Sequence, residues 1–103
     1  MQYTHDIWRI LASRNLAYNS TGGAAASTTS VGAQTYAVQL SYPGSASSTG
    51  GLHVAIGEAP VADSTSPFLP ANWVQVWKIT PGQKISAISN DAGTGTLNIT
   101  ELG

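Results

Sequence analysis

The chain has 103 residues, which allows one domain with a single small core. Only 9% of the residues are charged, the formal net charge is −1, and no cysteine is present. Without a basic excess, nucleic-acid binding is not expected, and without thiols there are no disulfides, thiolate metal sites or cysteine nucleophiles. The low charge also argues against disorder, because disordered chains combine few apolar residues with high charge.

Large apolar side chains are scarce. The apolar fraction of 42% includes 14 alanines, while leucine, isoleucine, valine and phenylalanine together number 21. A core built from so few large side chains is marginal. We therefore expect a thin all-β domain that completes its burial by self-association, with a trimer favoured, or against another protein. No apolar stretch could span a bilayer and no signal peptide is evident, so synthesis in a cytoplasm and no membrane partner are expected.

The amino-acid composition divides the chain into an N-terminal arm with a linker, residues 1–32, and a β domain, residues 33–103. Residues 19–32 are almost entirely serine, threonine, glycine and alanine, which predicts an extended or mobile linker. Residues 4–11 predict either a weak strand or a short helix, because their apolar residues recur at helical spacing. A tryptophan beside an arginine has the composition of an interface anchor, so we expect this arm to contact another subunit or a partner protein. The expected contact residues are Ile7, Trp8, Arg9, Ile10 and Leu11.

Alternation with a period of two predicts the strands of the β domain. Residues 34–42 place four apolar side chains on one face: Tyr36, Val38, Leu40 and Tyr42. Residues 52–57 place Leu52, Val54 and Ile56 on one face, with His53 opposite. We expect six strands at most, with residues 52–102 forming a meander in which consecutive strands pair.

The connections are indicated by proline and glycine. Residues 58–71 contain three prolines, so they cannot pair as a central strand and predict a long irregular connection. Pro81-Gly82 predicts a type II turn with Gly82 at positive φ, and residues 90–93 predict a hairpin turn. A calcium loop at residues 90–93 is disfavoured because it lacks alternating acidic ligands.

The strand at residues 73–80 is apolar on both faces: Trp73, Trp77 and Ile79 face one way, Val74 and Val76 the other. Two apolar faces indicate a strand that is covered on both sides. Either another subunit covers one of these sides or the domain's own Phe68 and Leu69 do. We select Trp73 and Trp77 as further interface residues.

No grouping of residues indicates catalysis. Asp6 adjoins His5, but neighbours on a strand point to opposite faces, and His53 alternates with apolar residues, which predicts a solvated or interface position. The five carboxylates are dispersed, so neither a catalytic pair nor a metal or cofactor site is expected. Trp73 and Trp77 on one strand face could form a carbohydrate-stacking row, although core or interface burial is favoured because few polar companions accompany them.

Several short motifs follow one another along the chain: Gly32-Ala33-Gln34-Thr35-Tyr36-Ala37-Val38, Val54-Ala55-Ile56-Gly57-Glu58-Ala59-Pro60-Val61-Ala62, Phe68-Leu69-Pro70-Ala71-Asn72, Ile79-Thr80-Pro81-Gly82-Gln83-Lys84-Ile85 and Gly95-Thr96-Leu97-Asn98-Ile99-Thr100-Glu101-Leu102. The order of these motifs resembles that of small accessory virion proteins of tailed bacteriophages, and the similarity covers about two thirds of the chain. The first thirty residues are unmatched. Each motif is structural, since it supplies turns or core residues.

The resemblance implies an all-β fold, namely a small single-domain β-sandwich or jelly-roll-like barrel with an extended N-terminal arm. It implies a structural role in the virion without fixing the position there. We expect a location on the capsid surface, synthesis in the host bacterial cytoplasm and no cofactor. The leading hypothesis is a capsid decoration or cement protein that binds itself and the major capsid protein. The alternatives are a carbohydrate- or receptor-binding module on the virion and a head–tail connector or head-fibre component.

Overall fold

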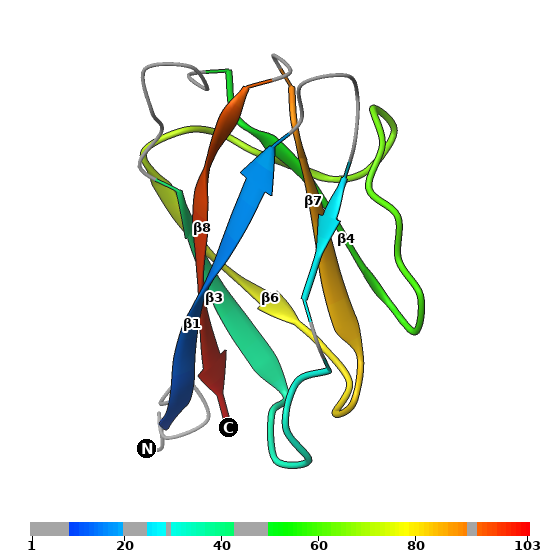
Figure 1. Ribbon diagram of the computed structural model, residues 1–103. Coiled ribbons are helices and arrows are strands. Elements are labelled where there is room, and N and C mark those ends of the chain that lie inside the picture. The colour runs from blue at the N-terminus through cyan, green and yellow to red at the C-terminus, as the bar shows by residue number, and fades with distance from the viewer. Residues whose placement is uncertain (1–8, 20–24, 29, 43–49, 91–92) are drawn as a thin grey trace, which may run out of the picture.

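The computed structural model describes residues 9–19, 25–28, 30–42, 50–90 and 93–103. These residues form eight strands in two antiparallel sheets and contain no helix, so the prediction of an all-β domain is confirmed (Figure 1). The strands are β1 (Ile10–Asn19), β2 (Ala26–Ser27), β3 (Ala37–Tyr42), β4 (Leu52–Gly57), β5 (Phe68–Leu69), β6 (Trp73–Lys78), β7 (Lys84–Ser89) and β8 (Thr94–Leu102).

The strands pair from the ends of the chain inward. β1 pairs with β8, β2 with β7, β3 with β6 and β4 with β5, each antiparallel. Contacts of β3 with β8 and of β4 with β7 then complete two sheets. Sheet A has the order β1-β8-β3-β6 and sheet B the order β2-β7-β4-β5. The predicted meander is therefore wrong: among the described strands, β4 and β5 alone are consecutive neighbours.

The turn after β6 has the predicted conformation but a different role. Gly82 has a φ of 87°, and the Gln83 N–H donates to the Thr80 carbonyl at 3.1 Å. This matches the type II turn expected from Pro81-Gly82. However, the turn carries the chain from sheet A to sheet B and does not close a hairpin. The same holds after β7, because β8 lies in the other sheet.

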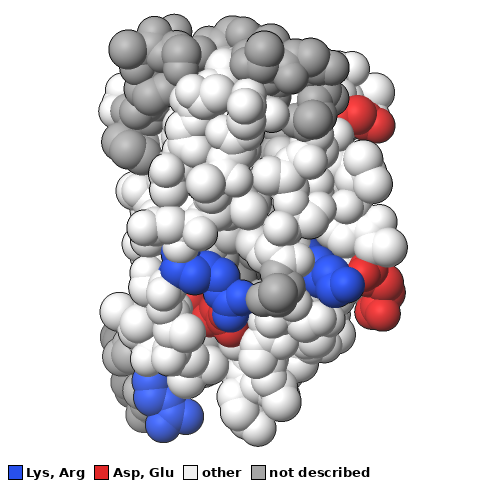
Figure 2. Space-filling view, viewed as in Figure 1, with Lys and Arg blue, Asp and Glu red and all other residues white. Residues whose placement is uncertain are grey.

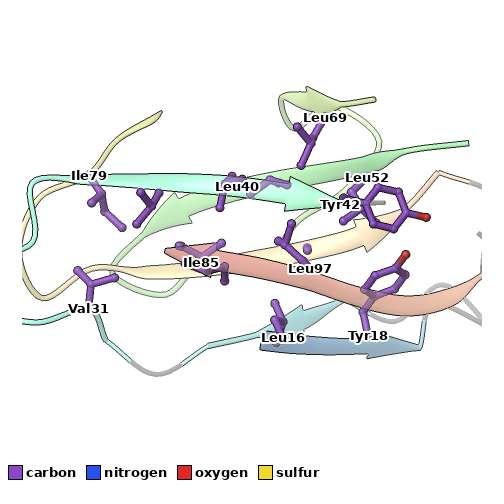
Figure 3. Close-up of a cluster of buried hydrophobic side chains, with 14 residues drawn as sticks. Leu16, Tyr18, Val31, Leu40, Tyr42, Leu52, Leu69, Ile79, Ile85 and Leu97 are labelled. Carbon is purple, nitrogen blue, oxygen red and sulfur yellow. The ribbon is translucent and has the colours of Figure 1, made fainter. Parts of the chain in front are cut away.

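One apolar core lies between the two sheets (Figure 3). Alternate residues of β3 point into it, since Val38, Leu40 and Tyr42 are each at most 1% exposed. Tyr36, predicted on the same face, precedes β3 and is 50% exposed. Sheet B contributes Leu52, Val54, Leu69, Ile85 and Ala87. Leu69 reaches the core from the two-residue β5, which is the one strand within the proline-rich connection.

The separate N-terminal arm is not confirmed. β1 pairs with β8 from Ile10 to Asn19, and its Leu16 and Tyr18 are buried in the core. The predicted linker contributes β2 at the edge of sheet B and a buried Val31. The division at residue 32 therefore does not separate independent parts of the described chain. Residues 1–8 and 20–24, and with them Ile7 and Trp8, lie outside the described residues.

Of the strand expected within residues 4–11, Ile10 and Leu11 are in β1, which continues to Asn19, while residues 4–8 lie outside the described residues. The helix alternative is wrong for Ile10 and Leu11, which are in β1. The alternation of β1 was concealed because one inward position holds Arg14, between an exposed Ser13 and an exposed Asn15. An inward charge breaks the apolar pattern that identifies a half-buried strand.

Candidate interaction surface

β6 is an edge strand of sheet A, and among the described strands its neighbour in the sheet is β3. The edges of sheet B are the two-residue β2 and β5, which are too short to offer much pairing. The other edge of sheet A is β1, where the register shifts between Ile10 and Ala12. β6 pairs with β3 over six residues without a shift. β1 is longer and pairs with β8 from Ala12 to Asn19 without a further shift, but its outward side chains include the polar Ser13 and Asn15. β6 is therefore the regular edge of the described structure whose outward side chains are mainly apolar.

The backbone groups of β6 alternate between β3 and open space. The Ile79 N–H donates to the Tyr36 carbonyl at 3.2 Å, which fixes the phase of the ladder. Hydrogen-bonded and non-hydrogen-bonded pairs alternate in an antiparallel ladder, so Trp73, Gln75 and Trp77 turn their backbone groups toward β3. The backbone groups of the alternate residues, Val74, Val76 and Lys78, point away from the sheet. No other described strand meets them.

The two tryptophans of β6 lie on the core-facing side of sheet A. Trp73, Gln75 and Trp77 are opposite Tyr42, Leu40 and Val38, which are buried. Trp77 is half-buried against the core, and its Nε1 donates to Gln75 Oε1 at 2.7 Å. Trp73, at the start of the strand, is 59% exposed. The two side chains do not form a free stacking row, because one of them is already packed and hydrogen-bonded.

Val74 and Val76 point to the outer face of sheet A, where they are 57% and 50% exposed. Phe68 and Leu69, one of the two covers considered from the sequence, instead form β5 at the edge of sheet B. A hollow beside Val76 is lined by Tyr36, Ala37, Val76 and Lys78. The outer face of β6 is thus apolar and open among the described residues.

Farther from β6, the outer face of sheet A is polar but uncharged. Asn98 on β8 donates to Ser13 at 3.2 Å and to Asn15 at 3.0 Å, both on β1. Thr100 donates to the Asn98 side chain at 3.1 Å. The face of the molecule seen in Figure 2 presents a few charged groups on a mainly uncharged surface. Such a surface gives little electrostatic protection against association.

The start of β1 holds the remaining predicted interface residues that the structure describes. Ile10 is 70% exposed and Leu11 38%. Arg9 exchanges two backbone hydrogen bonds of 2.9 Å with Gly103, which extends the pairing of β1 and β8 to the end of the chain. The predicted interface role of Arg9, Ile10 and Leu11, like that of Trp73 and Trp77, stays a prediction.

The sequence did not reveal a buried polar cluster around the carboxylate of Glu101. Glu101 is 2% exposed and points inward from β8. It forms an ion pair with Arg14 and accepts hydrogen bonds from the Gly32 N–H at 3.0 Å and the Thr35 hydroxyl at 2.7 Å. Burial acts to raise the pKa of Glu101, but these hydrogen bonds and the charge of Arg14 outweigh it and hold the pKa below its ordinary value. The cluster ties β1 and the segment before β3 to β8.

His53 is half-buried and joins three segments. Its Nδ1 lies 2.9 Å from the Ser66 carbonyl, its Nε2 lies 3.0 Å from Asn90 Oδ1, and its ring packs on Phe68. In the part of the chain that the structure describes, no three histidine, aspartate or glutamate side chains gather as metal ligands. Nor do those residues include a helix long and apolar enough to cross a membrane.

Comparisons with family models, with curated proteins and with solved structures found no match to this chain. Among the described residues, the β6 edge leaves apolar side chains and outward backbone groups uncovered, which is unusual for a domain that functions as a monomer.

Proposed function

We propose that the chain is a structural protein of a tailed-bacteriophage virion, a capsid decoration or cement protein that binds the major capsid protein and copies of itself. The ordered motifs of the sequence suggest the virion as its location. The observation that carries the structural role is the β6 edge, whose Val74 and Val76 are half-exposed beside backbone groups that no other described strand pairs with. Soluble monomers avoid such edges, which invite pairing with another chain.

The proposal includes a jelly-roll fold. In a jelly roll, eight strands form two Greek keys in two packed sheets, an architecture used by viral capsid and lectin domains. The pairing of β1 with β8, β2 with β7, β3 with β6 and β4 with β5, folded over into two stacked sheets, supports this assignment. The fold is common to many functions, so it supports the virion assignment only together with the motifs.

The proposal includes no enzymatic activity. The polar clusters among the described residues have structural partners: Glu101 is held by Arg14, Gly32 and Thr35, and His53 bridges Ser66 and Asn90. Their role is to fix neighbouring segments of the chain. This use of polar groups is consistent with a structural protein that acts through a binding surface.

Counting copies per virion tests the proposal. Phage particles carrying and lacking the gene are compared by cryo-electron microscopy, and purified protein is then added back to the deficient particles. A decoration protein leaves density missing at lattice positions of the shell, and the added protein restores it. Loss of density at a single ring below the head would instead identify a connector, and no difference in the head would refute the decoration role.

The carbohydrate-binding alternative has a separate test. Glycan-array binding by the wild-type protein that disappears in folded Trp73→Ala protein would favour it. Trp77→Ala is the less informative variant, because Trp77 also packs against the core. Absence of glycan binding together with restored capsid density leaves decoration as the function.

A further inference from the structure

We propose that two copies of the chain pair through their β6 edges, antiparallel across a two-fold axis, so that the two A sheets become one continuous sheet. The inference rests on the self-association included in the proposed function and names the surface that performs it. An edge strand beside a two-fold axis meets its own copy in antiparallel orientation, so the same patch serves both partners. β6 offers a regular six-residue edge with the exposed apolar Val74 and Val76. β2 and β5 have only two residues each, and the outer face of the longer edge β1 carries the hydrogen-bonded polar side chains of Ser13 and Asn15.

The hydrogen-bonding pattern between β6 and β3 restricts how the β6 strands of two copies can align. Outward backbone groups belong to Val74, Val76 and Lys78, and these must meet the same set on the second copy. With Val76 on the axis, Val76 faces its own copy and Val74 faces the second copy's Lys78, so every outward N–H and C=O is paired. With Gln75 on the axis, Lys78 would face Asn72, which has left the strand at a φ of 65°. The register centred on Val76 is therefore the one we propose.

The side chains are compatible with this register. Lys78 is the single charged residue of β6, and the pairing places it opposite Val74 and away from its own copy. Like charges therefore do not face each other, and the aliphatic stem of the lysine covers a valine. The hollow beside Val76 adjoins the axis, so the second copy covers part of its lining.

A contact between two such short strands is small by the standards of protein interfaces, which bury about 1,200–2,000 Å² when stable. The isolated dimer is accordingly weak, and it gains effective affinity when both copies are held on one capsid. Pairing of identical edges closes at two copies. This interface therefore makes a dimer, in contrast to the trimer favoured from the sequence.

Single cysteines test the register directly, because the natural chain contains none. Val76→Cys and Val74→Cys are matched variants: same strand, same residue type, and similar exposure. Under mild oxidation of the concentrated protein we expect a covalent dimer with Val76→Cys, because the two sulfurs lie across the axis. Val74→Cys should remain monomeric, since the two positions are about 13 Å apart along the strands, beyond disulfide reach. Equal yields from the two variants, or no dimer from Val76→Cys, would overturn the inference.

Sedimentation of unoxidised protein gives an independent measurement. The wild type is expected to dimerise with rising concentration, and Val76→Lys is expected to lose that dimer because two lysines would meet at the axis. Val61→Lys is the control, because it makes the same chemical change at a position away from β6. Val61 is 75% exposed and lies in the connection before β5. Circular dichroism checks that both variants are folded. A monomeric wild type, or a Val76→Lys protein that still dimerises, contradicts the β6 pairing; capsid occupancy is measured separately and tests only the proposed function.

Discussion

Replacing Glu101 by glutamine tests whether the buried carboxylate stabilises the link between β1, β8 and the segment before β3. Glutamine has nearly the same size, so the substitution leaves no cavity. Its amide oxygen can still accept from the Gly32 N–H and the Thr35 hydroxyl, which lie 3.0 and 2.7 Å from Glu101 Oε1. Its amide nitrogen, in contrast, meets the Arg14 guanidinium as a second donor. The substitution thus removes charge and keeps shape.

The expected loss follows from these contacts. A hydrogen bond to a charged acceptor is roughly twice as strong as a neutral one, so two such bonds together lose about 1.5 kcal/mol. The ion pair adds about 0.5 kcal/mol, a modest amount because the Arg14 side chain is 34% exposed and remains partly hydrated. We therefore expect Glu101→Gln to lower the free energy of unfolding by about 2 kcal/mol and the melting temperature by roughly 10 °C for a domain of this size.

The same contacts predict a pH dependence with a definite sign. The folded protein holds the pKa of Glu101 below its ordinary value of 4.5, because the hydrogen bonds and Arg14 outweigh burial. A lowered folded pKa gives stability that is fully present above the ordinary value and is lost as the pH falls through the folded value. The difference in unfolding free energy between wild type and Glu101→Gln should therefore be full at neutral pH and shrink below about pH 4.5.

Urea unfolding of both proteins at a series of pH values measures this difference. Asp63, whose pKa is also lowered, mainly by hydrogen bonds from Thr65, is present in both proteins, so its contribution cancels. A difference that stays constant from neutral to acid pH would refute the assignment of the stabilisation to the ionised carboxylate. So would a Glu101→Gln protein as stable as the wild type.

Four further changes probe the core, a turn and the N-terminal strand. Leu40→Ala, at a position with 0% exposure, should lower the unfolding free energy by about 3 kcal/mol in urea titrations. Gly82→Ala should lower it by about 1 kcal/mol, through backbone strain alone, because φ is 87° and a Cβ would meet nothing within 4 Å. Deleting residues 1–8 should preserve the circular dichroism spectrum and cooperative melting, whereas deleting residues 1–20 removes β1 with its buried Leu16 and Tyr18 and should abolish the cooperative transition.

The sequence located the regular strands because their inward residues alternate. β3 and β4 were predicted with the correct buried faces, through Val38 and Leu40 in one and Leu52 and Val54 in the other. The two-residue β2 and β5 are too short to show a period. Strand partners were wrong in the second half, because short connections are compatible both with a hairpin and with a crossing to the opposite sheet.

The buried ion pair illustrates a second limit of sequence reasoning. Arg14 and Glu101 are 87 residues apart, and each was judged by its own neighbours in the chain. An arginine at an inward position interrupts the apolar alternation, so the sequence alone predicts that the strand ends there. The carboxylate partner that permits its burial is not apparent from the neighbouring residues. Thus Arg14, which interrupts the apolar pattern of β1, also forms the ion pair with Glu101 that adds to the backbone pairing of β1 with β8.

The two apolar faces of β6 have separate physical reasons. One face belongs to the core, as the half-buried Trp77 shows, while the other carries Val74 and Val76 on the outside of sheet A. A strand in the centre of a sheet could bury both faces under the chain's own layers, but β6 is at an edge, where its outer residues and its outward backbone groups are open together. Valine favours the extended backbone of a strand, and its exposed apolar side chain is unfavourable in water. These two residues therefore favour the addition of another strand at this edge. The apolar pattern and the position in the sheet therefore support the same proposal, the addition of a neighbouring chain to sheet A.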